Sequence, residues 1–236
     1  MGLEQSHAFQ TVAFCETDPF CQKVLMKNWP GVRIYDDVRK LTGQSLKSDG
    51  ISVDAICGGF PCQDISTAGK RIGIGGSRSG LWSEFSRLIG EIRPKYVFVE
   101  NVADLLIRGL DVVLSDLAAL GYDAEWHCIP ASYIGAPHRR DRIWIIAYPS
   151  CIGLEGYRVE NEGASAKKFL IGGGLAERAA ASRDSNGWPH EPYICRVAYG
   201  VPNRSHRLRM LGNSIVPAIP KIIGESLRKL DQKNIE

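Results

Sequence analysis

The residue best suited to nucleophilic chemistry is Cys62, in the run Gly58-Gly59-Phe60-Pro61-Cys62-Gln63-Asp64-Ile65-Ser66. Apolar residues from Val53 lead into two glycines and a proline, and a glycine-rich stretch, Gly69 to Gly80, follows. This pattern predicts a loop at the carboxyl end of a buried strand, where open α/β sheets bind their ligands. A thiol exposed there suits a nucleophile, whereas an arbitrary lone cysteine is more often a small buried apolar residue.

A carboxylate occupies a similar position in Glu100-Asn101-Val102, which directly follows the apolar run Tyr96 to Val99. Burying a carboxylate is unfavourable unless it is paired or protonated, so Glu100 either faces a cleft or performs acid chemistry. If parallel strands carry Cys62 and Glu100, both face the same cleft. The alternative is an ordinary solvated glutamate at a strand end.

A basic segment, His138-Arg139-Arg140-Asp141-Arg142, precedes another apolar run, Ile143 to Ala147. Side chains alternate along a strand, so His138, Arg140 and Arg142 are expected on one face. Such a cationic row can hold phosphates, orient a carboxylate and favour a thiolate. A solvated surface patch is the alternative interpretation.

Short apolar runs and stretches of helical periodicity alternate along the chain, which predicts an α/β fold with a Rossmann-like, mostly parallel sheet and helices on both faces. Strands are expected at Thr11 to Cys15, Val53 to Cys57, Tyr96 to Val99 and Ile143 to Ala147. Helices are expected at Pro19 to Asn28, Leu81 to Ile92, Leu110 to Leu120 and Ile215 to Leu230. We expect one main domain over residues 1–148, a small irregular region over 149–202, and a segment over 203–236 that returns to the main domain.

Bulk properties favour a globular protein without metal. The net charge of +3 permits contact with a polyanion without requiring it. The seven cysteines show no CxxC spacing and the five histidines are scattered, so we expect reduced thiols and no metal site. The apolar runs are too short to cross a bilayer, so the sequence predicts a soluble, cytoplasmic protein, with monomer as the default.

Taken together and in this order, the motifs resemble those of the DNA (cytosine-5) methyltransferases. Phe60-Pro61-Cys62-Gln63 is similar to that family's nucleophile motif, and Glu100-Asn101-Val102 to its ENV motif. His138-x-Arg140-x-Arg142 resembles its QxRxR motif with His in place of Gln, and Gly212-Asn213-Ser214-Ile215-Val216-Pro217 its closing GNSxxP motif. Residues 149–202 stand where the family keeps its variable target-recognition region.

The resemblance implies catalytic roles for four residues and a double-stranded DNA substrate. Cys62 would attack carbon 6 of a cytosine flipped out of the helix, while Glu100 protonates ring nitrogen 3. Arg140 would position the base and Glu100, with Arg142 in support. The setting that the family suggests is a restriction-modification system or a phage.

The resemblance also implies S-adenosyl-L-methionine as the cofactor. Glu16 resembles the acid that binds the ribose hydroxyls, and Asp37 the acid that meets the adenine amino group. The alternative for Asp37 is a turn-capping aspartate. Pro61, Asn213 and Ser214 complete the expected cofactor contacts, with Asn213 and Ser214 at the methionine end.

One part of the family pattern has no counterpart here. The family opens with a strand and a glycine-rich FxGxGG turn, whereas this sequence starts at Met1-Gly2-Leu3-Glu4, which resembles the helix after that turn. A truncated gene, a misassigned start and a decayed remnant are the competing explanations. The alternative function is therefore a truncated, catalytically inactive DNA-binding relative.

Other functions remain open as well. A non-catalytic binding module would use Arg183, Trp188, His190 and Arg196 in the region after Tyr148. A cysteine hydrolase would need a histidine partner such as His127 or His138, for which no motif is evident. RNA in place of DNA is a third possibility.

Overall fold

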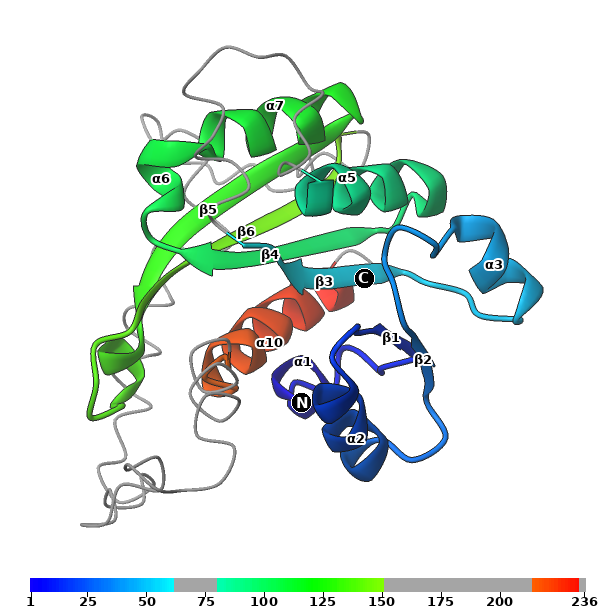
Figure 1. The fold of residues 1–236 in the computed structure, drawn as a ribbon. Helices are drawn as coiled ribbons and strands as arrows, with labels where there is room; N and C mark the ends of the chain where they lie inside the picture. Colours follow the sequence, from blue (N-terminus) through cyan, green and yellow to red (C-terminus); the bar gives the residue numbers. More distant parts are fainter. Residues whose placement is uncertain (62–79, 151–213, 234–236) are drawn as a thin grey trace.

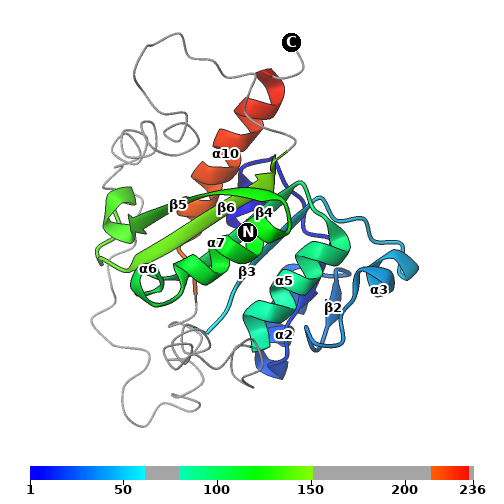
Figure 2. The same ribbon diagram turned by 90° about the horizontal axis from the view of Figure 1, so that it is seen from above.

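A four-stranded sheet covered by helices on both faces forms the centre of the molecule (Figure 1). The computed structural model describes residues 1–61, 80–150 and 214–233. Helices α5 (Gly80–Ile92) and α7 (Leu110–Ala119) lie side by side over one face, as Figure 2 shows from above. Helix α10 (Ala218–Lys233) covers the other face together with the short α1 (Gly2–Gln5).

The four strands run in the order β3-β4-β6-β5. Their bounds are β3 Ala55–Gly59, β4 Tyr96–Val102, β5 Tyr122–Pro130 and β6 Asp141–Pro149. β3 and β4 are parallel, whereas β6 is antiparallel to both β4 and β5. Because of this reversal, the beginning of β6 lies at the carboxyl end of β4. The basic segment and the ENV motif therefore meet at one edge of the sheet.

A second, two-stranded sheet lies beside the first. β1 (Ala13–Cys15) and β2 (Arg33–Tyr35) pair in parallel, and among the strands in the described ranges they pair only with each other. A small apolar cluster connects them to the rest: Leu41, Leu46 and Leu88 are buried, and Ala13 and Val53 pack against them. Side-chain packing across α5, not a continuous strand ladder, therefore attaches this sheet.

The remaining helices have clear local causes. In α2 (Pro19–Asn28), the Asp18 carboxylate accepts hydrogen bonds from the amides of Phe20 and Cys21, and proline occupies the first turn. In α3 (Gly43–Ser48), Thr42 and Ser45 form a reciprocal capping box. Two single turns, α6 (Leu105–Arg108) and η2 (Ala131–Ile134), follow β4 and β5.

Alternation along the central strands divides the core into two halves. One half packs the sheet against α5 and α7, and its buried residues include Val97, Val99, Val113, Leu117, Ile143, Ile145 and Ala147. The other half packs it against α10, and its buried residues include Phe98, Trp144, Ile146, Ile219, Ile223 and Leu227. Helix α1 approaches α10 closely at Gly224, where an added Cβ would lie 2.3 Å from the Ser6 hydroxyl oxygen.

The predicted α/β fold class is confirmed, with parallel strands followed by an antiparallel pair at one edge. The four expected strands are present, with β4 and β6 extending beyond their apolar runs. The sequence interpretation missed β2, β5 and α3. The proposed boundaries at residues 148/149 and 202/203 stay predictions, because residues 151–213 lie outside the described ranges.

Candidate active site

The candidate site lies where β3 and β4 end and β6 begins. Gly59, the last residue of β3, is paired with Glu100 on β4, and Val102 on β4 is paired with Arg142 on β6. The chain continues from Gly59 through buried Phe60 and exposed Pro61. Cys62 follows directly and lies outside the described residues, as does Asn213.

Glu100 and Arg142 form an ion pair at the centre of this edge. The Arg142 Nε lies 2.9 Å from the Glu100 Oε1, and only 18% and 15% of the two side chains is exposed. Burial raises the pKa of Glu100 above its ordinary value, although the nearby Arg142 and Arg140 guanidinium groups lower it. Desolvation therefore outweighs the two cations, and Glu100 holds a proton more readily than a solvated glutamate.

Arg140 lies directly before β6, near enough to the Glu100 carboxylate for its charge to act on it. The strand on which the shared face of His138, Arg140 and Arg142 was predicted does not extend to the first two of them, because β6 begins at Asp141 and Arg140 has a left-handed backbone with φ of 37°. The Arg140 Nη2 donates a hydrogen bond of 2.5 Å to the carbonyl oxygen of Ser214. Burial and the Arg142 charge lower the pKa of Arg140 below its ordinary value, although the Glu100 charge raises it.

Two residues without an assigned role in the sequence interpretation shape this edge. A Cβ on Gly59 would lie 2.9 Å from the Glu100 carbonyl oxygen and 3.3 Å from its Oε2, so glycine permits the close approach. The buried Asn101 side chain donates from Nδ2 to the Phe60 carbonyl oxygen at 2.9 Å. Asn101 thereby fixes the main chain two residues before Cys62. A polar side chain inside an otherwise apolar strand was the available signal.

Glu16 and Asp37 gather at the carboxyl ends of β1 and β2. The Glu16 amide donates to the Tyr35 carbonyl oxygen at 2.9 Å, and the Glu16 Oε1 accepts from the Asp18 amide at 2.8 Å. Burial, followed by the charges of Asp37, Asp36 and Glu16, raises the pKa of the Cys15 thiol to about 11. These acids therefore concentrate negative potential at the end of the small sheet.

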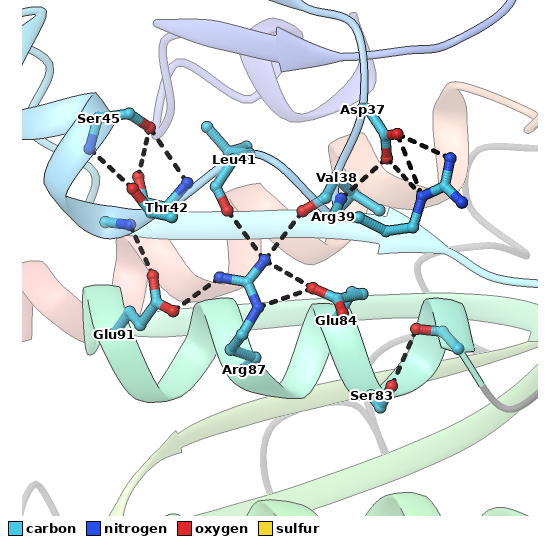
Figure 3. A network of polar contacts seen from close by, with 12 residues as sticks. Asp37, Val38, Arg39, Leu41, Thr42, Ser45, Ser83, Glu84, Arg87 and Glu91 are labelled. Carbon is cyan, nitrogen blue, oxygen red and sulfur yellow. Dashed lines mark hydrogen bonds and ion pairs between the residues drawn. The ribbon is translucent and has the colours of Figure 1, made fainter. Parts of the chain in front are cut away.

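Asp37 is engaged by Arg39 (Figure 3). The Asp37 Oδ1 accepts from the Arg39 amide and Nε, each at 2.9 Å, and its Oδ2 accepts from the Arg39 Nη2 at 2.7 Å. These hydrogen bonds lower the pKa of Asp37 to about 2. Asp37 is thus both a turn-capping residue and a permanently ionised acceptor at neutral pH.

Neither a metal site nor a membrane span occurs in the described part of the chain. In residues 1–61, 80–150 and 214–233, no group of three or more His, Cys, Asp or Glu side chains could hold a metal ion. Within those same ranges, every helix is too short or too polar to cross a lipid bilayer.

Replacing Arg142 by methionine is expected to destabilise the fold by roughly 1–3 kcal/mol, below the roughly 3–5 kcal/mol of a fully buried pair because both side chains are partly exposed. The pKa of Glu100 in the folded protein is already raised above its ordinary value of 4.5. The stabilisation that comes from protonated Glu100 is therefore fully present below about pH 4.5 and is lost as the pH rises through the pKa of the folded state. Without Arg142 the folded pKa rises further. The destabilisation should therefore be larger at about pH 8 than at about pH 5.

Urea unfolding of the Arg142→Met variant at both pH values measures this effect. The control is Arg139→Met, because the Arg139 side chain is 82% exposed and its pair with Asp141 contributes little. A loss of stability in Arg142→Met that is the same at both pH values would show that the pKa of Glu100 does not depend on Arg142.

Comparison with known proteins identifies the family of this chain. The family model of C-5 cytosine-specific DNA methylases matches residues 1–176. The Type II methyltransferase M2.BsuMI of Bacillus subtilis (strain 168) is 39% identical over 155 residues, which are 62% of this chain and 38% of that protein. The Type II methyltransferase M.CviJI of Paramecium bursaria Chlorella virus IL3A is 37% identical over 207 residues, which are 87% of this chain and 50% of that protein. The chain thus spans half the length of these relatives or less.

Solved structures agree on the fold. A prophage-encoded protein from E. coli, described as a DNA modification methyltransferase, has a TM-score of 0.52 at 26% identity, over 64% of this chain and 44% of that chain. The S. pombe Dnmt2 methyltransferase has a TM-score of 0.53 at 15% identity, over 83% of this chain and 56% of that chain, and shows the fold alone. These likenesses confirm the Rossmann-like fold class, and the family match over residues 1–176 shows that the chain belongs to the C-5 cytosine-specific DNA methylases.

Proposed function

We propose that this protein transfers a methyl group from S-adenosyl-L-methionine to carbon 5 of cytosine in DNA through a covalent adduct at Cys62. The observation that carries the proposal is the largely buried Glu100 side chain, paired with Arg142 and held beside the end of β3. Its raised pKa suits a group that donates a proton at neutral pH. Membership of the methylase family supplies the reaction class.

The proposed steps balance in protons and electrons. The Cys62 thiolate forms a bond to carbon 6 of a flipped cytosine, and Glu100 donates a proton to ring nitrogen 3. The resulting electron pair at carbon 5 would take the methyl group that the sulfonium of S-adenosyl-L-methionine supplies when bound, and the sulfur–methyl bond would break to leave a neutral thioether. A base then removes the carbon 5 proton, the bond to Cys62 breaks, and the proton on nitrogen 3 returns. Arg140 and Arg142 hold Glu100 in place throughout.

The described residues fit the nucleoside end of the cofactor. Glu16 and Asp37 are carboxylates at the ends of adjacent parallel strands, where ribose hydroxyls and an exocyclic amine can donate to them. The ionised state of Asp37 suits an acceptor of the adenine amino group. Pro61, Asn213 and Ser214 are proposed to contact the rest, with Asn213 and Ser214 near the methionine end. Arg140 already contacts the Ser214 carbonyl oxygen.

The proposed substrate is double-stranded DNA from which the target cytosine is flipped. Residues 149–202 would read the target sequence, between a catalytic domain over 1–148 and a returning segment over 203–236. Because M2.BsuMI and M.CviJI are named as Type II methyltransferases, a restriction-modification setting is proposed as well. We propose a monomer that works without metal.

Trapping tests the proposal directly. The purified protein is incubated with S-adenosyl-L-methionine and duplex DNA that carries 5-fluorocytosine, because fluorine at carbon 5 blocks the final elimination. A covalent complex with the unaltered chain and none with Cys62→Ala is the expected result. Release of the trapped DNA would require the bond to Cys62 to break, so denaturing electrophoresis suffices as the readout.

Two outcomes would overturn the proposal. An adduct that survives in Cys62→Ala would remove Cys62 as the nucleophile. No adduct in either protein, with DNA binding retained in an electrophoretic shift assay, would replace methyl transfer by a non-catalytic DNA-binding role.

A further inference from the structure

Arg87 on α5 makes four polar contacts through one guanidinium group, and no role has yet been proposed for it. Its Nη2 donates to two carbonyl oxygens, those of Val38 and Leu41, each at 2.9 Å. Its Nε donates to Glu84 and its Nη1 to Glu91, each at 2.7 Å (Figure 3). The guanidinium thus lies between two carboxylates of its own helix. At the same time it donates hydrogen bonds to the main chain of a segment almost fifty positions earlier in the sequence.

That segment is the turn that carries Asp37. The Asp37 carbonyl oxygen accepts from the amides of Lys40 and Leu41 at 3.0 and 3.1 Å, which closes residues 37–41 into a compact turn. Arg87 binds the carbonyl of Val38, the residue after Asp37, and that of Leu41, the last residue of the turn. One guanidinium therefore fixes the turn at both ends.

A second contact reinforces this attachment just beyond the turn. The Glu91 Oε2 accepts from the Gly43 amide at 2.8 Å. A Cβ on Gly43 would lie 3.2 Å from the Glu91 Cβ and carbonyl oxygen, so glycine permits the contact. Glu91 thus binds Arg87 with one oxygen and the chain after the turn with the other. The pKa of Glu91 is lowered by the Gly43 amide and by Arg87, which keeps it ionised.

From this geometry we infer that Arg87 is a positioning residue for cofactor binding: it holds the turn that presents Asp37 to the adenine. The inference rests on the proposed function, because it takes Asp37 as the adenine acceptor. A planar guanidinium can donate in four directions at once, to two carbonyls and two carboxylates, whereas a lysine ammonium with three donors cannot reproduce that fork. Lysine should therefore restore the charge of Arg87 without restoring the position of the turn.

Two measurements test the role, both made on the full chain without reference to turnover. The first is amide hydrogen exchange of residues 38–43 in the absence of ligand, which should become faster in Arg87→Ala and Arg87→Lys. The second is the calorimetric Kd for S-adenosylhomocysteine. We expect about tenfold weaker binding in both variants, the loss that accompanies one misplaced charge-assisted hydrogen bond to the ligand.

The control is Arg93→Ala, an arginine at the end of the same helix. Arg93 donates to the Leu120 carbonyl oxygen and stacks over Tyr122, away from the Asp37 turn. Exchange of residues 38–43 and the Kd should both stay unchanged in this variant. Thermal unfolding of each variant identifies any that fail to fold. If Arg87→Ala fails to fold, the comparison of Arg87→Lys with the unaltered chain still decides the test.

A double variant separates positioning from general damage. If Arg87 acts through Asp37, then Asp37→Asn should weaken binding, and adding Arg87→Ala should weaken it little further. If the losses of binding free energy in the two single variants add fully in the double variant, the inference about Arg87 is overturned and the proposed function is not. An unchanged Kd in Arg87→Ala despite faster exchange would have the same meaning. Failure of the unaltered chain to bind S-adenosylhomocysteine would instead overturn the proposed cofactor site, and with it the role of Arg87 toward adenine.

Discussion

Under the proposed mechanism, replacing Glu100 by glutamine is expected to lower the single-turnover rate constant for methyl transfer by roughly 10²–10⁴-fold, the range that a positioned general acid contributes. The amide is close in shape to the carboxyl group and can still accept a hydrogen bond from Arg142 at the position of the Glu100 Oε1. It cannot release a proton to ring nitrogen 3 of the cytosine. Chemistry should therefore suffer far more than folding or DNA binding.

Single-turnover methylation of duplex DNA with tritiated S-adenosyl-L-methionine measures this loss. The control variant is Glu125→Gln, also on the central sheet, whose side chain contacts Tyr148 and His127 away from the β4 edge. Activity within about threefold of the unaltered chain in Glu100→Gln would rule out Glu100 as the proton donor, because that loss is smaller than the expected contribution of a general acid.

Truncating Ile145 to alanine is expected to reduce the free energy of unfolding by roughly 2–5 kcal/mol. Ile145 is fully buried in β6, which is hydrogen-bonded to a strand on each side. Its side chain packs in the half of the core that lies between the sheet and helices α5 and α7. Removing three carbons there leaves a cavity that the surrounding strands and helices cannot close.

Urea unfolding followed by circular dichroism measures the change in stability. Ile107→Ala is the matched control, because it removes the same atoms from a side chain that is 86% exposed, and it should change stability by about 0.5 kcal/mol or less. Equal losses in the two variants would contradict the position of Ile145 in the core.

The strands that the sequence predicted are those with uninterrupted apolar runs. β4 and β6 lie in the middle of the sheet and are covered on both faces, so each contains a run of consecutive apolar residues. β5, which is last in the order of the described strands, was missed because Asp123, Glu125 and His127 interrupt its apolar pattern. β2 is only three residues long and begins with an arginine, so no window of ordinary length detects it.

The part of the candidate site that could be predicted from the sequence consists of the residues that lie at the ends of apolar strands. Glu100 and Arg142 were both proposed from their motifs, and the structure pairs them at 2.9 Å. The antiparallel direction of β6, which causes that meeting, leaves no mark in its residues. The contributions of Gly59 and Asn101 depend on atoms from different strands, and the role of Arg87 depends on a turn far away in the sequence.

The separate two-stranded sheet has a consequence for ligand affinity. Two strands of three residues are too few to be stable alone, so β1, β2 and the Asp37 turn hold their shape through the Leu41, Leu46 and Leu88 cluster and the Arg87 contacts. This part of the chain should open as a local cooperative unit at a lower free energy than the four-stranded sheet. A ligand that binds only its closed form has its affinity reduced by the fraction of time the unit is open. Packing at Leu88, a buried apolar side chain that takes no part in the polar contacts of the Asp37 turn, thereby becomes a determinant of affinity.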